Sequence, residues 1–120
     1  AVYSAGHVSL AILEVVVHAD LALAPHYVVI PVDFDEALVE SLDPGRLPAS
    51  WRRHPAPAAV VALGDEWLGE CRSVILRVPS VVVPMEPNII LNPLHPASRE
   101  IEIGKPGVLK VDARLSKGRG

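Results

Sequence analysis

Apolar residues recur along the first half of this chain with two different spacings. The first five residues are a short apolar run, which predicts a strand over residues 1–5. Over residues 6–20 the apolar side chains recur every three or four positions and leave almost no polar face, which indicates a buried helix. A second helix is predicted over residues 56–70, where Val60 and Trp67 stand two turns apart.

Between and after the two predicted helices, the pattern changes to short apolar runs that end at turn residues. Residues 26–34 form a strand interrupted by Pro31, which predicts an edge position or a bulge. The acidic segment from Asp33 to Asp43 indicates a solvated surface connection. Further strands are predicted over residues 73–78, 80–84, 88–92, 100–103 and 108–112. This order indicates an α+β fold with few helices and a small, mixed, largely antiparallel sheet.

Prolines interrupt the apolar runs most often in the stretch VPSVVVPMEPNIILNPLHP, residues 78–96. Because proline cannot donate to a strand ladder, Pro79, Pro84 and Pro87 are expected at strand starts, edges or crossings. Ser80 would then be held rigidly at the first residue of a strand, where its hydroxyl could serve a site. The simpler alternative is that Ser80 satisfies a backbone group at a bend, the commoner arrangement for a serine beside proline.

Composition and charge restrict the class of protein. A chain of 120 residues that is 50% hydrophobic is expected to form one domain, residues 1–120, with a real core. The net charge of −3 predicts no basic surface for nucleic acid, and no apolar run is long enough to span a bilayer. The single cysteine, Cys71, excludes an internal disulfide and a cysteine-based metal site. With no secretory signal visible, we expect a cytoplasmic protein without a bound metal.

Glu14 is the first candidate for chemistry because it lies inside an apolar helix. A carboxylate with apolar neighbours is costly to bury unless it is paired or used. His18, four residues further on, could pair with Glu14 on the same helix face. A structural pair and a functional carboxylate therefore fit the spacing equally well. Tyr3, in the strand before this helix, is the nearest aromatic side chain.

Five segments of the chain carry a combination of motifs, and in order they are AVYSAGHVSLAILEVVVH, LPASWRRHPAP, LGDEWL, VPSVVVPMEPNIILNPLHP and VDARL. Together they resemble the RES-domain family, the toxin component of bacterial toxin–antitoxin pairs whose antitoxin carries an Xre-like helix-turn-helix. The resemblance covers nearly the whole chain, and the pattern PS…P.E.N…NP.HP is its most specific part.

The resemblance implies an ADP-ribosyltransferase-like fold that uses NAD as a substrate, without a cofactor, and cleaves its nicotinamide–ribose bond. The family site is described by an arginine, a tyrosine, a glutamate and a serine. Tyr3, Glu14 and Ser80 match the last three and are the predicted catalytic residues, with Tyr3 and Ser80 also binding substrate. Asn88 is a further candidate for substrate binding. Family members carry the site arginine in a segment before this strand, which we expect to be missing from the N-terminus of this chain.

Other interpretations stay open at this stage. The acceptor can be water, phosphate or a protein side chain, which would make the protein a glycohydrolase, a phosphorylase or an ADP-ribosyltransferase. A nucleotide-binding protein without turnover and a purely structural protein are the alternatives. The expected partners are NAD and an Xre-like antitoxin, with no nucleic acid and no membrane, and a homo-oligomer is left open. Arg46, Arg52 and Arg53 do not match the family motif, so none is assigned the arginine role.

Overall fold

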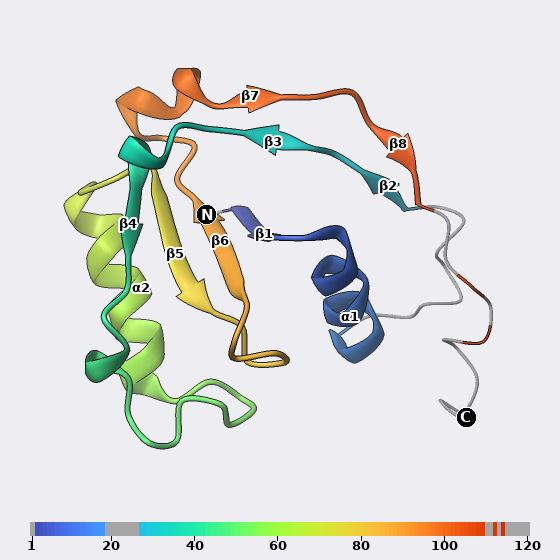
Figure 1. Cartoon of the computed structure of the whole chain (residues 1–120). Coiled ribbons are helices and arrows are strands. Elements are labelled where there is room, and N and C mark those ends of the chain that lie inside the picture. Colours follow the sequence, from blue (N-terminus) through green and yellow to red (C-terminus); the bar gives the residue numbers. More distant parts are fainter. Residues whose placement is uncertain (1, 19–26, 110–111, 113, 115–120) are drawn as a thin grey trace.

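The computed structural model describes residues 2–18, 27–109, 112 and 114. Within these residues, the main sheet has four strands in the order β1-β6-β5-β4 (Figure 1). The β1–β6 and β6–β5 pairs are antiparallel, and β4 runs parallel to β5. Together with the two helices, this sheet confirms the predicted α+β fold with a mixed, largely antiparallel sheet. The bounds are β1 Val2–Ala5, α1 Val8–His18, β4 Val39–Ser41, α2 Ala58–Glu70, β5 Ile75–Pro79 and β6 Pro87–Leu91.

The two faces of the main sheet have different surroundings, because side chains alternate between the faces along each strand. Ile75 and Ile89 point to one face, where they form a buried cluster with Val74. The partly buried residues packed on this cluster are Phe34, Leu38, Val39, Leu91, Ala97 and Ile101. The positions between them, Leu76 and Ile90, lie opposite each other in the register and line a cavity. One face therefore packs on the buried cluster, and the other borders the cavity.

Helix α2 is fixed to the start of β5 by Trp67. This side chain is 1% exposed, and its Nε1 donates to the Ser73 hydroxyl at 2.8 Å. That hydroxyl in turn donates to the backbone oxygen of Ile75 at 2.9 Å. The helix ends at Cys71, whose φ of 53° is left-handed. Neither described helix is long and apolar enough to cross a membrane.

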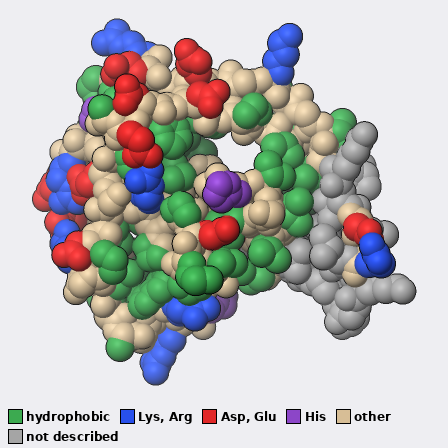
Figure 2. Space-filling model, in the orientation of Figure 1, with side chains coloured by type: hydrophobic (Ala, Val, Ile, Leu, Met, Phe, Trp, Pro, Cys, Tyr) green, Lys and Arg blue, Asp and Glu red, His purple; other side chains and the backbone are tan. Residues whose placement is uncertain are grey.

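Charged side chains form a network on the side of the molecule where α2 and β4 lie (Figure 2). Arg72 donates to Glu40, Glu66 and Glu70 at 2.9, 3.1 and 2.8 Å. Arg46 adds a second contact to Glu66 at 3.2 Å. The network joins helix α2, strand β4 and the short turn after β4, Pro44–Arg46, at the surface.

Two short antiparallel pairs form a ribbon along one side of the main sheet (Figure 1). Strand β2, Val28–Val29, pairs with β8, Gly107–Val108, and β3, Val32–Asp33, pairs with β7, Glu102–Ile103. Pro31 separates β2 from β3, so the predicted interruption of this strand is confirmed. The rest of the strand predicted over residues 108–112 includes Lys110 and Val111, which lie outside the described residues.

Two of the predicted elements were wrong. The acidic segment is not only a surface connection, because it contains β4, whose Val39 packs on the core. The segment 80–84 is not a strand but part of the turn between β5 and β6, which the Ser80 N–H closes by donating to the Glu86 oxygen at 2.9 Å. Pro79 ends β5, Pro87 begins β6, and the two prolines lie opposite each other in the register. Their places at strand ends confirm what the proline pattern predicted.

Candidate active site

The Ser80 hydroxyl is fully buried and has three hydrogen-bond partners. It accepts from the backbone N–H groups of Val82 at 3.1 Å and Val83 at 3.0 Å, and it donates to Glu14 Oε1 at 2.9 Å. A serine hydroxyl has one donor and two acceptor positions, so these partners use its whole capacity. Ser80 therefore satisfies a bend and also serves Glu14. It follows β5 instead of beginning a strand, because its oxygen holds the amides of the turn.

Glu14 connects this turn to helix α1 and to strand β6. Its Oε1 also accepts from Asn88 Nδ2 at 3.2 Å, so two donors from distant parts of the chain meet on one oxygen. We call Glu14, Ser80 and Asn88 the Glu14 cluster. The alternative partner, His18, has a side chain that lies outside the described residues. Leu10, one turn before Glu14, is 0% exposed and anchors this face of the helix.

A glycine sets the position of α1 relative to β6. The Gly6 N–H donates to the Pro87 backbone oxygen at 3.1 Å. A Cβ on Gly6 would lie 3.1 Å from Pro87 Cγ and 3.3 Å from Pro87 O, so a larger residue would push the two segments apart. Ala5 pairs with Asn88 in the register, next to this contact. The close approach of the β1–α1 connection thus brings Glu14 within reach of Asn88.

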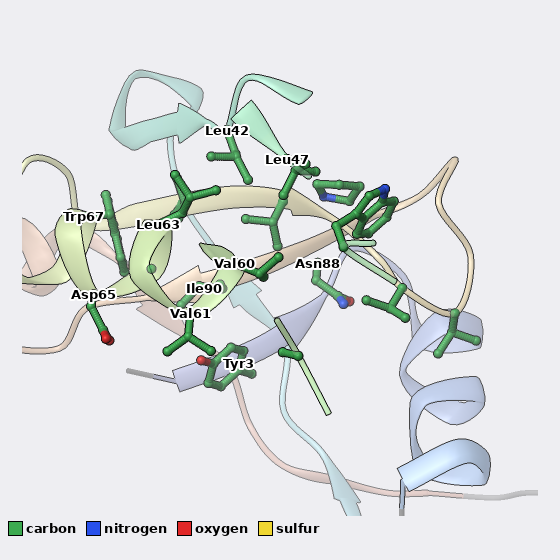
Figure 3. A pocket seen from close by; sticks show the side chains of 18 of the residues that line it. Tyr3, Leu42, Leu47, Val60, Val61, Leu63, Asp65, Trp67, Asn88 and Ile90 are labelled. Carbon is green, nitrogen blue, oxygen red and sulfur yellow. The ribbon is translucent and has the colours of Figure 1, made fainter. Parts of the chain in front are cut away.

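Tyr3, Glu14 and Asn88 line one cavity of about 710 Å3 between the main sheet and α2. Tyr3 pairs with Ile90, and Asn88 is two residues from Ile90 on the same strand. The side chains of Tyr3, Ile90 and Asn88 therefore lie on the same face of the sheet. Figure 3 shows Tyr3, Ile90 and Asn88 on the sheet side, facing residues of α2. The Tyr3 side chain is 77% exposed, which leaves its ring open to a ligand. Apolar lining residues include Leu42, Leu47, Val60, Val61, Leu63, Leu68, Leu76 and Val78.

Three of the four predicted site residues, Tyr3, Glu14 and Asn88, line the same cavity. Ser80 is connected to it by its hydrogen bond to Glu14. The catalytic and substrate-binding roles of the four residues stay predictions. Ser80 itself is 0% exposed, so it reaches the cavity only through the carboxylate it holds.

The loop before α2 contributes residues that sequence reasoning missed. Trp51, Arg53 and His54 all line the cavity. Arg46 instead pairs with Glu66, and Arg52 Nε donates to the Val81 backbone oxygen at 3.0 Å. No local pattern marks Arg53, because its place at the cavity depends on the path of an irregular loop. Over the described ranges, no group of three or more His, Cys, Asp or Glu side chains could hold a metal ion.

Comparison with known proteins agrees with the motif resemblance. The RES domain profile matches residues 1–112, so the chain belongs to the RES domain family. A protein named Toxin Res from Yersinia enterocolitica is 40% identical over 96 residues, which cover 79% of this chain and 63% of that toxin. A Prs ADP-ribosylating toxin from a Sphingobium species is 39% identical over 119 residues, 95% of this chain and 73% of the relative. Toxin Res from Photorhabdus laumondii is 36% identical over 121 residues, which cover 99% of this chain and 78% of that toxin.

Proposed function

We propose that this chain is the NAD-consuming part of a RES toxin and cleaves the nicotinamide–ribose bond. The observation that carries the proposal is the Glu14 cluster, a carboxylate held by two donors at the wall of a largely apolar cavity that also contains Tyr3. The names of the relatives support it, since two are toxins named Res and one is an ADP-ribosylating toxin.

Glu14 is the proposed catalytic residue. Cleavage of a glycosidic bond develops positive charge on the ribose carbon and ring oxygen, and a carboxylate beside them stabilises the transition state. Oε1 accepts from Ser80 and from Asn88, which restrains the rotation of the carboxylate. A charge that is already oriented requires no reorganisation during the reaction. The pair of hydrogen bonds thus prepares Glu14 for this role.

Tyr3 is the proposed residue for positioning the leaving group. Its side chain is 77% exposed and belongs to the strand that borders the cavity. An aromatic ring can stack on the nicotinamide ring and hold it in line for departure. In this proposal Tyr3 transfers no proton.

Ser80 and Asn88 act mainly through Glu14 in this proposal. The sequence suggested that Ser80 touches the substrate, but a side chain with 0% exposure and three partners is better suited to positioning. Asn88 both donates to Glu14 and lines the cavity, so it can also contact the ribose hydroxyls. Two residues from the same hairpin would therefore orient one carboxylate from α1.

The acceptor defines the second candidate function. Transfer to a protein side chain is favoured by the Sphingobium relative, which is named an ADP-ribosylating toxin. Water or phosphate as the acceptor gives a glycohydrolase or a phosphorylase. In all three cases we propose a cytoplasmic protein, and the family implies that it is paired with an Xre-like antitoxin. A nucleotide-binding protein without turnover is the non-catalytic alternative.

Incubating the purified chain with NAD and separating the products tests these alternatives. We expect release of nicotinamide, together with ADP-ribose for hydrolysis or ADP-ribose 1″-phosphate when phosphate is present. Label from adenine-labelled NAD on an added protein would instead identify a transferase. Binding of NAD without release of nicotinamide, under all three conditions, would contradict the enzymatic proposal.

A further inference from the structure

We propose that Arg53 is the anion-binding residue of this cavity and holds the diphosphate of a dinucleotide whose ribose lies at Glu14. The identity of the ligand rests on the proposed function. The role of Arg53 rests on its contacts, on the loop that carries it and on the charges around the cavity.

The contacts of the arginines separate Arg53 from its neighbours. Arg46 and Arg72 bind glutamates, and Arg52 binds the Val81 oxygen. Arg77 pairs with Glu36 on the other side of the sheet. Among the residues that the structure describes, the Arg53 side chain makes no hydrogen bond and no ion pair, although it lines the cavity. Its five N–H donors are therefore available to a ligand.

The loop that carries Arg53 is fixed to the turn that supports Glu14. Within the loop, the Trp51 N–H donates to Pro48 O at 3.0 Å and the Arg53 N–H donates to Ser50 O at 2.9 Å. Arg52 then ties the loop to Val81, the residue directly after Ser80. One turn thus supports the carboxylate through Ser80 and the cationic loop through Arg52. The backbone positions of Glu14 and Arg53 are set relative to each other before a ligand binds.

The charges around the cavity fit a ligand with an anionic part. Among the described lining residues, Arg53 is the one arginine or lysine, and the carboxylates are Glu14 and Asp65. A diphosphate brings two negative charges to a chain whose net charge is −3, so it needs a fixed cation. Arginine suits this task because its planar guanidinium donates two parallel hydrogen bonds to a phosphate group.

Binding of ADP-ribose to Arg53→Ala, Arg53→Lys and Arg99→Ala, measured by calorimetry, tests the inference. We expect Arg53→Ala to weaken ADP-ribose binding about 10- to 100-fold, the range for losing a charged hydrogen-bond donor. Arg53→Lys should retain part of the affinity as a point charge. Arg99 is exposed and does not line the cavity, so Arg99→Ala is the matched control and should bind as the wild type does. Nicotinamide riboside, which has no phosphate, should bind wild type and Arg53→Ala equally.

Equal ADP-ribose affinity in wild type and Arg53→Ala would overturn the inference, and so would a wild type that binds no ADP-ribose. Nicotinamide release by the wild type is measured separately, so the two proposals can fail independently. Release of nicotinamide with no effect of Arg53→Ala removes the role of Arg53 and leaves the proposed function. Loss of ADP-ribose binding in Arg53→Ala, without nicotinamide release by the wild type, supports Arg53 and removes the enzymatic proposal. Urea unfolding should show that Arg53→Ala is as stable as the wild type.

Discussion

Ser80 and Glu14, 66 residues apart in the chain, are joined by one hydrogen bond of 2.9 Å. The same hydroxyl accepts two turn amides, so its proton can point only toward the carboxylate. Buried groups with all partners in place specify one geometry, whereas removal of one member leaves others unsatisfied. Ser80 is therefore expected to affect both the fold and the orientation of Glu14.

Replacing Ser80 by Ala should reduce both stability and activity. The variant loses the acceptor for Val82 and Val83 and one donor to Glu14, which is expected to cost about 1–3 kcal/mol of unfolding free energy. Urea unfolding measures this cost, and nicotinamide release measures activity under conditions where the variant is folded. A folded Ser80→Ala protein with full NAD turnover would contradict the positioning role.

Replacing Glu14 by Gln should separate activity from stability. The amide oxygen of Gln can still accept from Ser80 and Asn88, so the free energy of unfolding is expected to change by less than about 1 kcal/mol. The negative charge is lost, and NAD cleavage should fall by about 100-fold or more, as for removal of other transition-state contacts. Circular dichroism during urea titration and a nicotinamide assay on the same sample check both parts. Unchanged turnover would remove Glu14 from the mechanism.

The turn between β5 and β6 is the element on which the site depends. It begins directly after Pro79, is closed by the hydrogen bond from Ser80 N–H to Glu86 O, and is held from outside by Arg52. Prolines at both strand ends prevent the ladder from continuing into the turn. The turn therefore keeps its shape for local reasons, and α1 is placed against it.

Arg52→Ala should loosen this turn without unfolding the protein. Loss of one exposed hydrogen bond to Val81 O is expected to cost about 0.5–1 kcal/mol. The amides of Val82 and Val83 should exchange with solvent faster, which hydrogen-exchange mass spectrometry or NMR can follow. Arg46→Ala removes a surface ion pair elsewhere and is the matched control, in which these two amides should exchange at the wild-type rate. The same exchange rate in all three proteins would show that Arg52 does not hold the turn.

Two Gly→Ala substitutions should have opposite effects on the elements that contain them. In α2, a Cβ at Gly69 meets nothing within 4 Å, and Ala is expected to stabilise the helix by about 0.5–1 kcal/mol. After β7, a Cβ at Gly104 would lie 2.6 Å from Pro31 Cγ, so Ala there should destabilise by about 1–3 kcal/mol. Thermal unfolding of both variants gives the signs. Stabilisation by Gly104→Ala would mean that its contact with Pro31 relaxes more easily than the geometry indicates, and destabilisation by Gly69→Ala would contradict the prediction for α2.

At the scale of the whole molecule, the sequence predicted those segments whose structure is determined by their own residues, and missed those whose structure depends on distant parts of the chain. The helices α1 and α2 follow from apolar spacing, and Pro31 divides β2 from β3 as expected. Strand β4 could not be predicted, because its polar residues Glu40 and Ser41 enter the sheet through parallel pairing with β5. The three valines after Ser80 favour a strand, but the serine hydroxyl binds two of their amides and holds them in a turn.

The candidate site was partly predictable for a similar reason. Glu14 stands out because a carboxylate in an apolar helix is costly to bury, and Ser80 because it lies in the proline-rich stretch that carries the family motif. Tyr3 and Asn88 share a face of the sheet because of the register between β1 and β6. This register depends on the pairing of two distant strands, so it could not be derived from the sequence of either strand alone. Arg53 lies on an irregular loop, so its place at the cavity could not be derived from spacing at all.

Acid should weaken the ionic contacts that connect α2 to the rest of the molecule. Arg72 donates to Glu66, and Arg46 lies near the same carboxylate, so the pKa of Glu66 is below its ordinary value of 4.5. A carboxyl whose pKa is lowered in the folded state stabilises the protein above its unfolded pKa. This contribution is lost as the pH falls below 4.5 and through the lower folded value. Glu66→Gln should therefore be less stable than the wild type at neutral pH, and the difference should shrink in acid.

Asp112→Asn is the matched control for this pH dependence. The pKa of Asp112 is also lowered, by Arg114, but these two residues are separated by one position and can interact in the unfolded chain as well. A group perturbed equally in both states adds no pH dependence to stability, so Asp112→Asn should follow the wild-type profile. High salt should reduce the effect of Glu66→Gln, because screening weakens exposed ion pairs. Urea midpoints across the acid range measure these differences, and a difference between Glu66→Gln and the wild type that does not change with pH would show that the ion pairs of Glu66 do not contribute to stability.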